Sequence, residues 1–170
     1  MLRILSIFFV TTLTLLAHPH EDLPVEHSEE ARKALAKAKT FTLYEGLPHP
    51  AKETEIFTTE ADRKDTKQIT GFFFYKPGLK VDPATTEKLR QVIADSDSLT
   101  EWEEKRCGGF HPDWSLTWRR GWSKDHALIC FSCEDIIYIS GDYQLRYTLT
   151  PAANKKLKAL LNPFQSKRPK

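Results

Sequence analysis

Residues 107–133 read CGGFHPDWSLTWRRGWSKDHALICFSC, and this stretch determines how we interpret the fold. It holds all three cysteines, three of the four tryptophans and two of the six histidines of the chain. Residues 114–119 and 127–133 have the composition of two β-strands, and Gly and polar residues at 121–125 predict a hairpin loop between them. Trp114 and Trp118 alternate with Ser115 and Thr117, so we expect the indoles to belong to the core face of a sheet.

The flanking sequence extends this hairpin into a larger sheet. Residues 135–140 and 143–149 predict two further strands joined at Gly141, and residues 40–47 and 68–75 are also strand candidates, the latter covered on both faces. Asp82-Pro83 and Thr150-Pro151 are strong helix starts, because the Asp or Thr caps free N–H groups and the Pro loses no hydrogen bond. The predicted class is α+β: an antiparallel β-meander of about five strands with helices packed on it, in a single domain.

The first 17 residues have the features of a secretory signal peptide. Arg3 forms a short positive region, residues 4–16 form an apolar run too short for a membrane span, and Ala17 supplies a small residue for cleavage. The mature chain is then expected to begin at or near His18, in the periplasm or outside the cell, with no stable membrane anchor. We assign residues 18–39 to an arm with a weak helix, 40–165 to the α+β domain and 166–170 to a solvated basic tail.

The charge balance argues against nucleic acid as a partner. The whole chain has 25 Lys and Arg residues against 23 Asp and Glu, and removal of Arg3 leaves 25 − 1 = 24 against 23. Such a balance lacks the basic excess that phosphate backbones attract. The identity of any partner is left open.

The cysteines allow three hypotheses. In an oxidising compartment a structural disulfide is the default, with one thiol left over. A hairpin loop at 121–125 places Leu116 opposite Cys130 and Asp113 opposite Cys133, so we expect Cys107 to pair with Cys133 and Cys130 to remain a buried thiol. Alternatively, Cys107, His111, Cys130 and Cys133 form a Cys₃His site of the kind that holds zinc. The third hypothesis is thiol–disulfide exchange at Cys130 and Cys133.

Other polar residues have plainer interpretations. His49 lies between two prolines and is expected to be a turn residue with its ring held outward, although it could be a ligand. His126 at a strand entry is expected to be structural. Arg119, Arg120 and Lys124 around the hairpin tip are expected to be solvated, with an anion-binding role as the alternative.

Three motifs resemble the signatures of a family of small, uncharacterised exported bacterial proteins. They are LYEGLPHP at 43–50, CGGFHPD at 107–113 and CFSC at 130–133, and the resemblance runs from about residue 40 to the end. The resemblance implies export and a shared fold, and it implies no reaction. Glu134 stands where many relatives have His after the second cysteine, which excludes the haem-attachment pattern Cys-x-x-Cys-His.

The functional hypothesis is a non-enzymatic exported module. The sequence contains no nucleophile elbow, phosphate loop or metalloprotease helix, so we assign no catalytic residue and no cofactor beyond the zinc alternative. We therefore expect a binding or structural module stabilised by one disulfide. The alternative is a metal-binding or thiol-redox protein that uses Cys107, His111, Cys130 and Cys133.

Overall fold

The computed structural model describes residues 33, 35–105, 108–141 and 143–169. The predicted signal peptide, residues 18–32 and 34 of the following arm, and Cys107 lie outside the described residues. Within those ranges no helix is long and apolar enough to cross a membrane.

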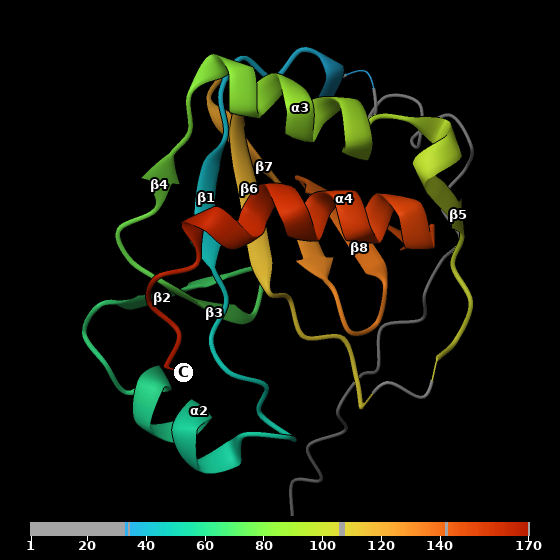
Figure 1. Cartoon of the computed structure of the whole chain (residues 1–170). Coiled ribbons are helices and arrows are strands. Elements are labelled where there is room, and N and C mark those ends of the chain that lie inside the picture. The colour runs from blue at the N-terminus through green and yellow to red at the C-terminus, as the bar shows by residue number, and fades with distance from the viewer. Residues whose placement is uncertain (1–32, 34, 106–107, 142, 170) are drawn as a thin grey trace, which may run out of the picture.

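One large antiparallel sheet forms the centre of the molecule, and the predicted α+β class and single domain are confirmed (Figure 1). Its strand order is β4-β1-β6-β7-β8-β9-β5. The middle four strands are the predicted meander: β6 Trp114–Arg120, β7 Ser123–Cys130, β8 Asp135–Ser140 and β9 Tyr143–Leu149. Short strands complete the edges: β1 Thr42–Glu45, β4 Leu79–Lys80 and β5 Leu99–Glu101. The sheet therefore has seven strands, more than the expected five.

The register of the first hairpin differs from the prediction. Leu116 pairs with Ala127, and not with Cys130, because the turn contains only Gly121 and Trp122. Gly121 has a φ of +62°, a conformation that glycine adopts without a steric penalty, so a short turn suffices and residues 123–125 extend the strand. The partner of every residue in β7 is displaced by three positions.

Two helices cover one face of the sheet (Figure 1). α3 Pro83–Ile93 and α4 Pro151–Leu161 begin at the predicted prolines. The Asp82 carboxylate accepts a hydrogen bond from the Thr85 amide at 2.9 Å, as expected of an N-cap. The helices bury a large apolar cluster with the inward face of the sheet, which includes Leu89, Ile93, Trp114, Leu116, Trp118, Ile129, Ile136, Leu157 and Leu161.

The predicted core role of Trp114 and Trp118 is confirmed, since both are nearly fully buried. The weak helix of the arm contributes more than expected. Lys33, Leu35 and Ala36 are helical, and the Leu35 side chain is completely buried in the same cluster.

A small hairpin covers part of the opposite face. It consists of β2 Thr66–Ile69 and β3 Phe72–Tyr75, so the single strand predicted at 68–75 is wrong. Thr70 and Gly71 both have positive φ and form the turn that divides it. Phe74 is fully buried against Leu128 and Ile137 of the large sheet. α2 Thr54–Ala61 lies beside the hairpin, where the Tyr75 hydroxyl contacts a Glu60 carboxylate oxygen at 2.7 Å.

Candidate functional site

The described parts of the three sequence motifs meet at one end of the large sheet. The Gly46 amide donates to the Asp113 carbonyl at 2.7 Å, and the Phe131 amide donates to the Asp113 carboxylate at 2.8 Å. Nε2 of His111 lies 2.7 Å from the Leu47 carbonyl oxygen. Segments 43–50, 108–113 and 130–133 therefore form one continuous structure at this end of the sheet.

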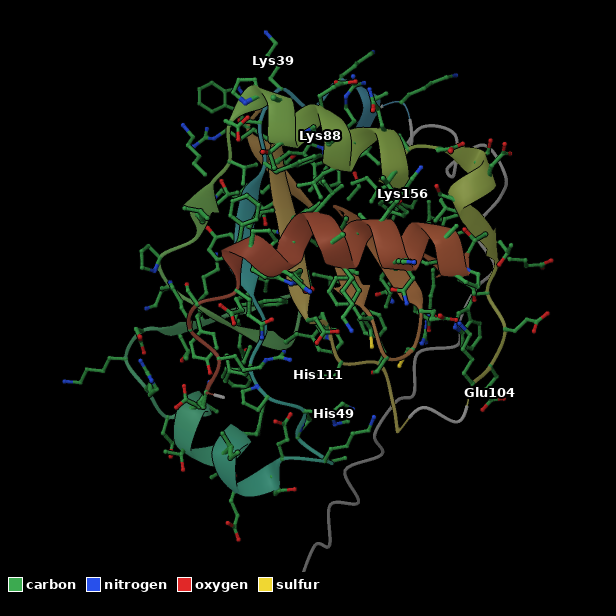
Figure 2. All side chains as sticks on the ribbon, in the orientation of Figure 1. Lys39, His49, Lys88, Glu104, His111 and Lys156 are labelled. Carbon is green, nitrogen blue, oxygen red and sulfur yellow. The ribbon has the colours of Figure 1, made fainter. Side chains whose placement is uncertain are left out.

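His49 and His111 lie side by side at this end, with ring centroids 5.1 Å apart (Figure 2). Both are buried, so the expectation that the His49 ring is held outward is wrong. Nδ1 of His49 accepts the Ala51 amide at 3.1 Å, while its buried Nε2 has no partner among the described residues. Burial is the main cause that lowers the pKa of His111, although its hydrogen bond to Leu47 acts in the opposite direction.

The predicted buried thiol at Cys130 is confirmed, because this cysteine is free and completely buried. The strand predicted to run to Cys133 ends at Cys130, and residues 131–134 form a turn in which Glu134 has a φ of +54°. The turn brings Cys130 and Cys133 close together, and no disulfide joins these two. The Cys133 sulfur lies 3.5 Å from the Gly109 carbonyl oxygen.

The described residues contain no group of three or more His, Cys, Asp or Glu side chains placed to hold a metal ion. His111, Cys130 and Cys133 therefore do not form such a group by themselves. Cys107 lies outside the described residues, so its pairing with Cys133 and the four-residue zinc site stay predictions.

Asp135 is a buried charged residue that the sequence analysis missed. Its side chain is fully buried, and one carboxylate oxygen accepts from Lys105 Nζ at 3.0 Å. The other accepts from Arg146 at 2.6 Å and from the Trp102 indole at 3.2 Å. The Arg146 guanidinium also lies 4.4 Å from the centre of the Trp102 ring. Each oxygen thus has a cationic partner, which indicates a role in stability.

The C-terminal segment is docked, in contrast to the solvated tail expected from its composition. Glu45, which is 5% exposed, accepts hydrogen bonds from three successive backbone amides at 2.9–3.0 Å, those of Ser166, Lys167 and Arg168. The Arg168 guanidinium contacts the Asp113 carboxylate at 3.1 Å and the Leu47 carbonyl at 2.7 Å. A buried acid in β1 therefore fixes the last described residues of the chain.

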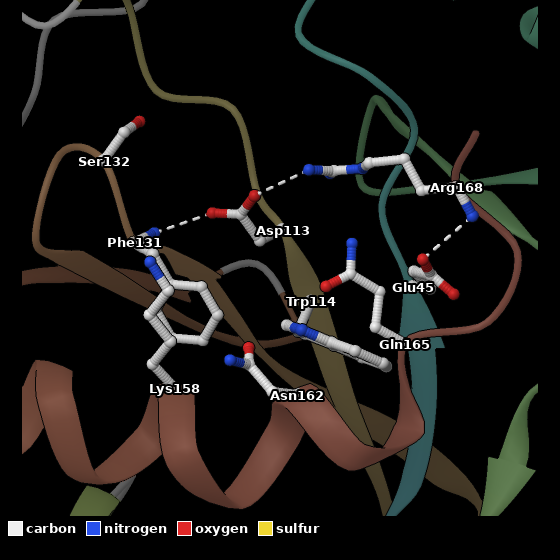
Figure 3. A pocket seen from close by; sticks show the side chains of 9 residues that line it. All are labelled: Glu45, Asp113, Trp114, Phe131, Ser132, Lys158, Asn162, Gln165 and Arg168. Atoms are coloured by element: carbon white, nitrogen blue, oxygen red, sulfur yellow. Dashed lines mark hydrogen bonds and ion pairs between the residues drawn. The ribbon is translucent and has the colours of Figure 1, made fainter. Parts of the chain in front are cut away.

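A pocket of about 300 Å³ lies between α4, the turn at 131–134 and this C-terminal segment (Figure 3). We call it the α4 pocket. Figure 3 shows that the Asp113–Arg168 ion pair and the contact of Glu45 with the Arg168 amide lie along its wall. Its lining combines two aromatic rings with charged and amide side chains: Glu45, Asp113, Trp114, Phe131, Ser132, Lys158, Asn162, Gln165 and Arg168.

The motifs pointed toward this end of the sheet, but they did not reveal the pocket. Glu45, Asp113, Phe131 and Ser132 come from the motif segments, whereas the other wall comes from the C-terminal part of the chain. The long-range contact between Glu45 and Arg168 has no signal in local sequence. Comparisons with protein-family models, with curated proteins and with solved structures give no match to this chain.

Proposed function

We propose that this protein is an exported, non-enzymatic binding module that holds a small polar ligand with an anionic group in the α4 pocket. The observation that carries the proposal is the charge pattern of the lining. Glu45, Asp113 and Arg168 all have intramolecular partners, whereas Lys158 has no ion pair with any residue that the structure describes. Lys158 is thus the charged group in the lining that is available to form an ion pair with a ligand.

The rest of the lining suits recognition of such a ligand. Trp114 and Phe131 supply aromatic surface, and the side-chain amides of Asn162 and Gln165 can donate and accept hydrogen bonds. A few directional polar groups among apolar walls are typical of small-molecule sites. The chemistry favours a ligand with a carboxylate for Lys158 and hydroxyl or amide groups for its neighbours.

The same lining supports binding over catalysis. Both carboxylate oxygens of Asp113 are occupied, one by Arg168 and the other by the Phe131 amide. Ser132 is the hydroxyl residue of the lining, and its oxygen contacts the Cys130 sulfur at 3.5 Å. A nucleophilic serine needs a base within hydrogen-bond reach. The described lining gives Ser132 no histidine or free carboxylate for that role.

The binding test compares two lysines of the same helix. Calorimetric or NMR titration of the mature protein with succinate, glutamate and glucuronate should show saturable binding of at least one. Lys158→Gln should weaken it about tenfold, because a hydrogen bond to a charged group contributes about 1.5–3 kcal/mol. Lys156→Gln is the matched control, because Lys156 is an exposed lysine of α4 that does not line the pocket, and it should leave affinity unchanged (Figure 2). Equal affinity in the two variants contradicts the proposal.

The cysteines provide the second candidate, a thiol or metal function, favoured by the contact between the Cys133 sulfur and Gly109, which follows Cys107 by two residues in the sequence. Intact mass of the exported protein separates the possibilities. Loss of two hydrogens indicates a disulfide, and peptide mapping should then find Cys107 linked to Cys133. An adduct near the mass of zinc that a chelator removes indicates the Cys₃His site instead. The same spectra should place the amino terminus at or near His18.

A further inference from the structure

A second hollow, of about 310 Å³, lies on the sheet and shares no lining residue with the α4 pocket. We call it the sheet-face hollow. β1, β4, β6 and β7 contribute to it. Its lining is hydroxyl-rich and basic: Thr40, Thr42, Tyr44, Lys80, Thr117, Trp118, Arg119 and Lys124. None of these residues is acidic.

The hydroxyl groups of the strands reach this hollow on the face opposite the helices. Leu116 and Trp118 of β6 belong to the helix-covered core, so Thr117 and Arg119 between and after them face the other way. Thr117 is nearly fully buried, and its hydroxyl lies 2.9 Å from Nδ1 of His126. The floor of the hollow is therefore built from ordered strand residues.

The cations of this hollow lack counter-charges. Lys80, Arg119 and Lys124 form no ion pair with any residue in the described ranges, and a fourth cation, Lys67, lies 3.9 Å from the centre of the Tyr44 ring. Arg119 and Lys124 are direct cross-strand partners. Like charges in that position destabilise a sheet. A bound anion relieves this repulsion.

The pKa of the neighbouring residue His126 reflects the same excess of positive charge. The pKa of His126 is lowered, first by burial and next by the charge of Lys67, with Lys124 acting in the same direction and Asp125 opposing it. The Asp125 carboxylate does not neutralise the hollow, because it is fully buried and bound to Arg120 at 2.8 Å.

We propose that the sheet-face hollow binds the oxyanion of a small phosphate- or sulfate-bearing molecule. A tetrahedral oxyanion has enough acceptor oxygens for the Arg119 guanidinium, the ammonium groups of Lys80 and Lys124, and the surrounding hydroxyls. The hollow exceeds the size of the anion alone, so it also accommodates part of the molecule that carries it. This site is independent of the α4 pocket and of its ligand.

The test is an NMR titration of the mature protein at fixed ionic strength with inorganic phosphate, inorganic sulfate and glucose 6-phosphate. Saturable shifts should appear at Thr42, Thr117, Arg119 and Lys124, and the pKa of His126 should rise as the anion offsets the nearby cations. Arg119→Gln and Lys124→Gln should each weaken binding about tenfold. The relative affinities of phosphate and sulfate identify which oxyanion the site prefers.

Lys88→Gln is the matched control, since it removes one charge from an exposed position on α3, on the other face of the sheet (Figure 2). It should leave affinity unchanged. Shifts that chloride reproduces, or equal weakening in all three variants, overturn the proposal. A short DNA duplex that binds while the small oxyanions do not also overturns it.

Discussion

The α4 pocket and the sheet-face hollow have similar volumes, but apart from Lys158 the charged groups of the first are paired within the fold, whereas those of the second are not. In the α4 pocket Glu45, Asp113 and Arg168 are tied to one another or to the backbone. In the hollow the cations have no acidic partner among the described residues. Charges that are paired within the fold contribute to its stability, and removing one leaves another group unsatisfied. Unpaired charges of one sign do not stabilise the fold, so their removal should affect binding and leave stability nearly unchanged.

Asp135 is the extreme case of a paired charge, and its replacement should have the largest effect. Asp135→Asn leaves Lys105 and Arg146 without their carboxylate, and their side chains are only 27% and 18% exposed. We expect the free energy of unfolding to fall by about 3 kcal/mol, the lower end of the range for a broken buried pair, because both cations keep some contact with water. Urea denaturation measures this change.

The control for Asp135→Asn is the same carboxylate-to-amide change at Glu104, which is exposed (Figure 2). Glu104→Gln should alter the free energy of unfolding by less than about 0.5 kcal/mol. A loss below about 1 kcal/mol in Asp135→Asn contradicts the view that this network stabilises the fold.

Glu45→Gln should have an intermediate effect, confined to the wall of the α4 pocket. The amide keeps one acceptor oxygen but replaces the other with an NH₂ group, which faces backbone donors. We expect a loss of about 1–3 kcal/mol, the cost of leaving buried donors unsatisfied. Hydrogen exchange at the Ser166, Lys167 and Arg168 amides should accelerate.

Glu101→Gln on the exposed edge strand β5 is the control for Glu45→Gln, and it should change neither stability nor exchange at the C-terminal segment. Unchanged exchange in Glu45→Gln would show that the tail is held by other contacts, and the α4 pocket would then not depend on this carboxylate.

The parts of the fold that sequence predicts are those with local signals. Asp82-Pro83 and Thr150-Pro151 fix the two helix starts because cap and proline act within one turn. The meander follows from strand-like segments separated by short turns. By contrast, β4 and β5 have two and three residues, too few to show a period. The predicted hairpin register is wrong because the polar residues 123–125 suit a loop and the beginning of a strand equally well.

The candidate site depends on contacts that no local pattern encodes. Glu45 contacts residues more than 120 positions away. Asp135 pairs with Lys105, which precedes it in the sequence, and with Arg146, which follows it. The burial of His49 likewise depends on its neighbour His111, which comes from a distant segment. The unpaired cations at Arg119 and Lys124 were visible in the sequence. Their alignment across two strands followed only from the correct register.

The smallest expected effect is that of Lys124→Gln on stability, and it sharpens the contrast with Asp135 and Glu45. Removing one member of the Arg119–Lys124 pair relieves cross-strand repulsion of about 0.2–1 kcal/mol and breaks no ion pair among the described residues. We expect the free energy of unfolding at about pH 7.5 to stay within about 0.5 kcal/mol of the original value, and not to fall.

The same variant should change how acid acts on the protein. The pKa of His126 in the folded state is lowered relative to its usual value, so the unfolded state takes up the proton first as pH falls. The stability linked to neutral His126 is therefore present above about pH 6.5 and is lost as pH falls through the folded pKa. Loss of the Lys124 charge raises that folded pKa. The pH range between the folded and the unfolded pKa of His126 then becomes narrower, so acid removes less stability.

His111 is the internal reference for this measurement. Its pKa is also lowered, but by burial and by the charges of His49 and Arg168, and Lys124 is not among the causes. NMR titration of the imidazole protons should therefore show the His126 pKa rising in Lys124→Gln while that of His111 stays unchanged. Equal movement of both would indicate a general change in the fold. An unmoved His126 pKa would mean that Lys124 does not contribute to the positive field, and that the cations of the sheet-face hollow do not act together.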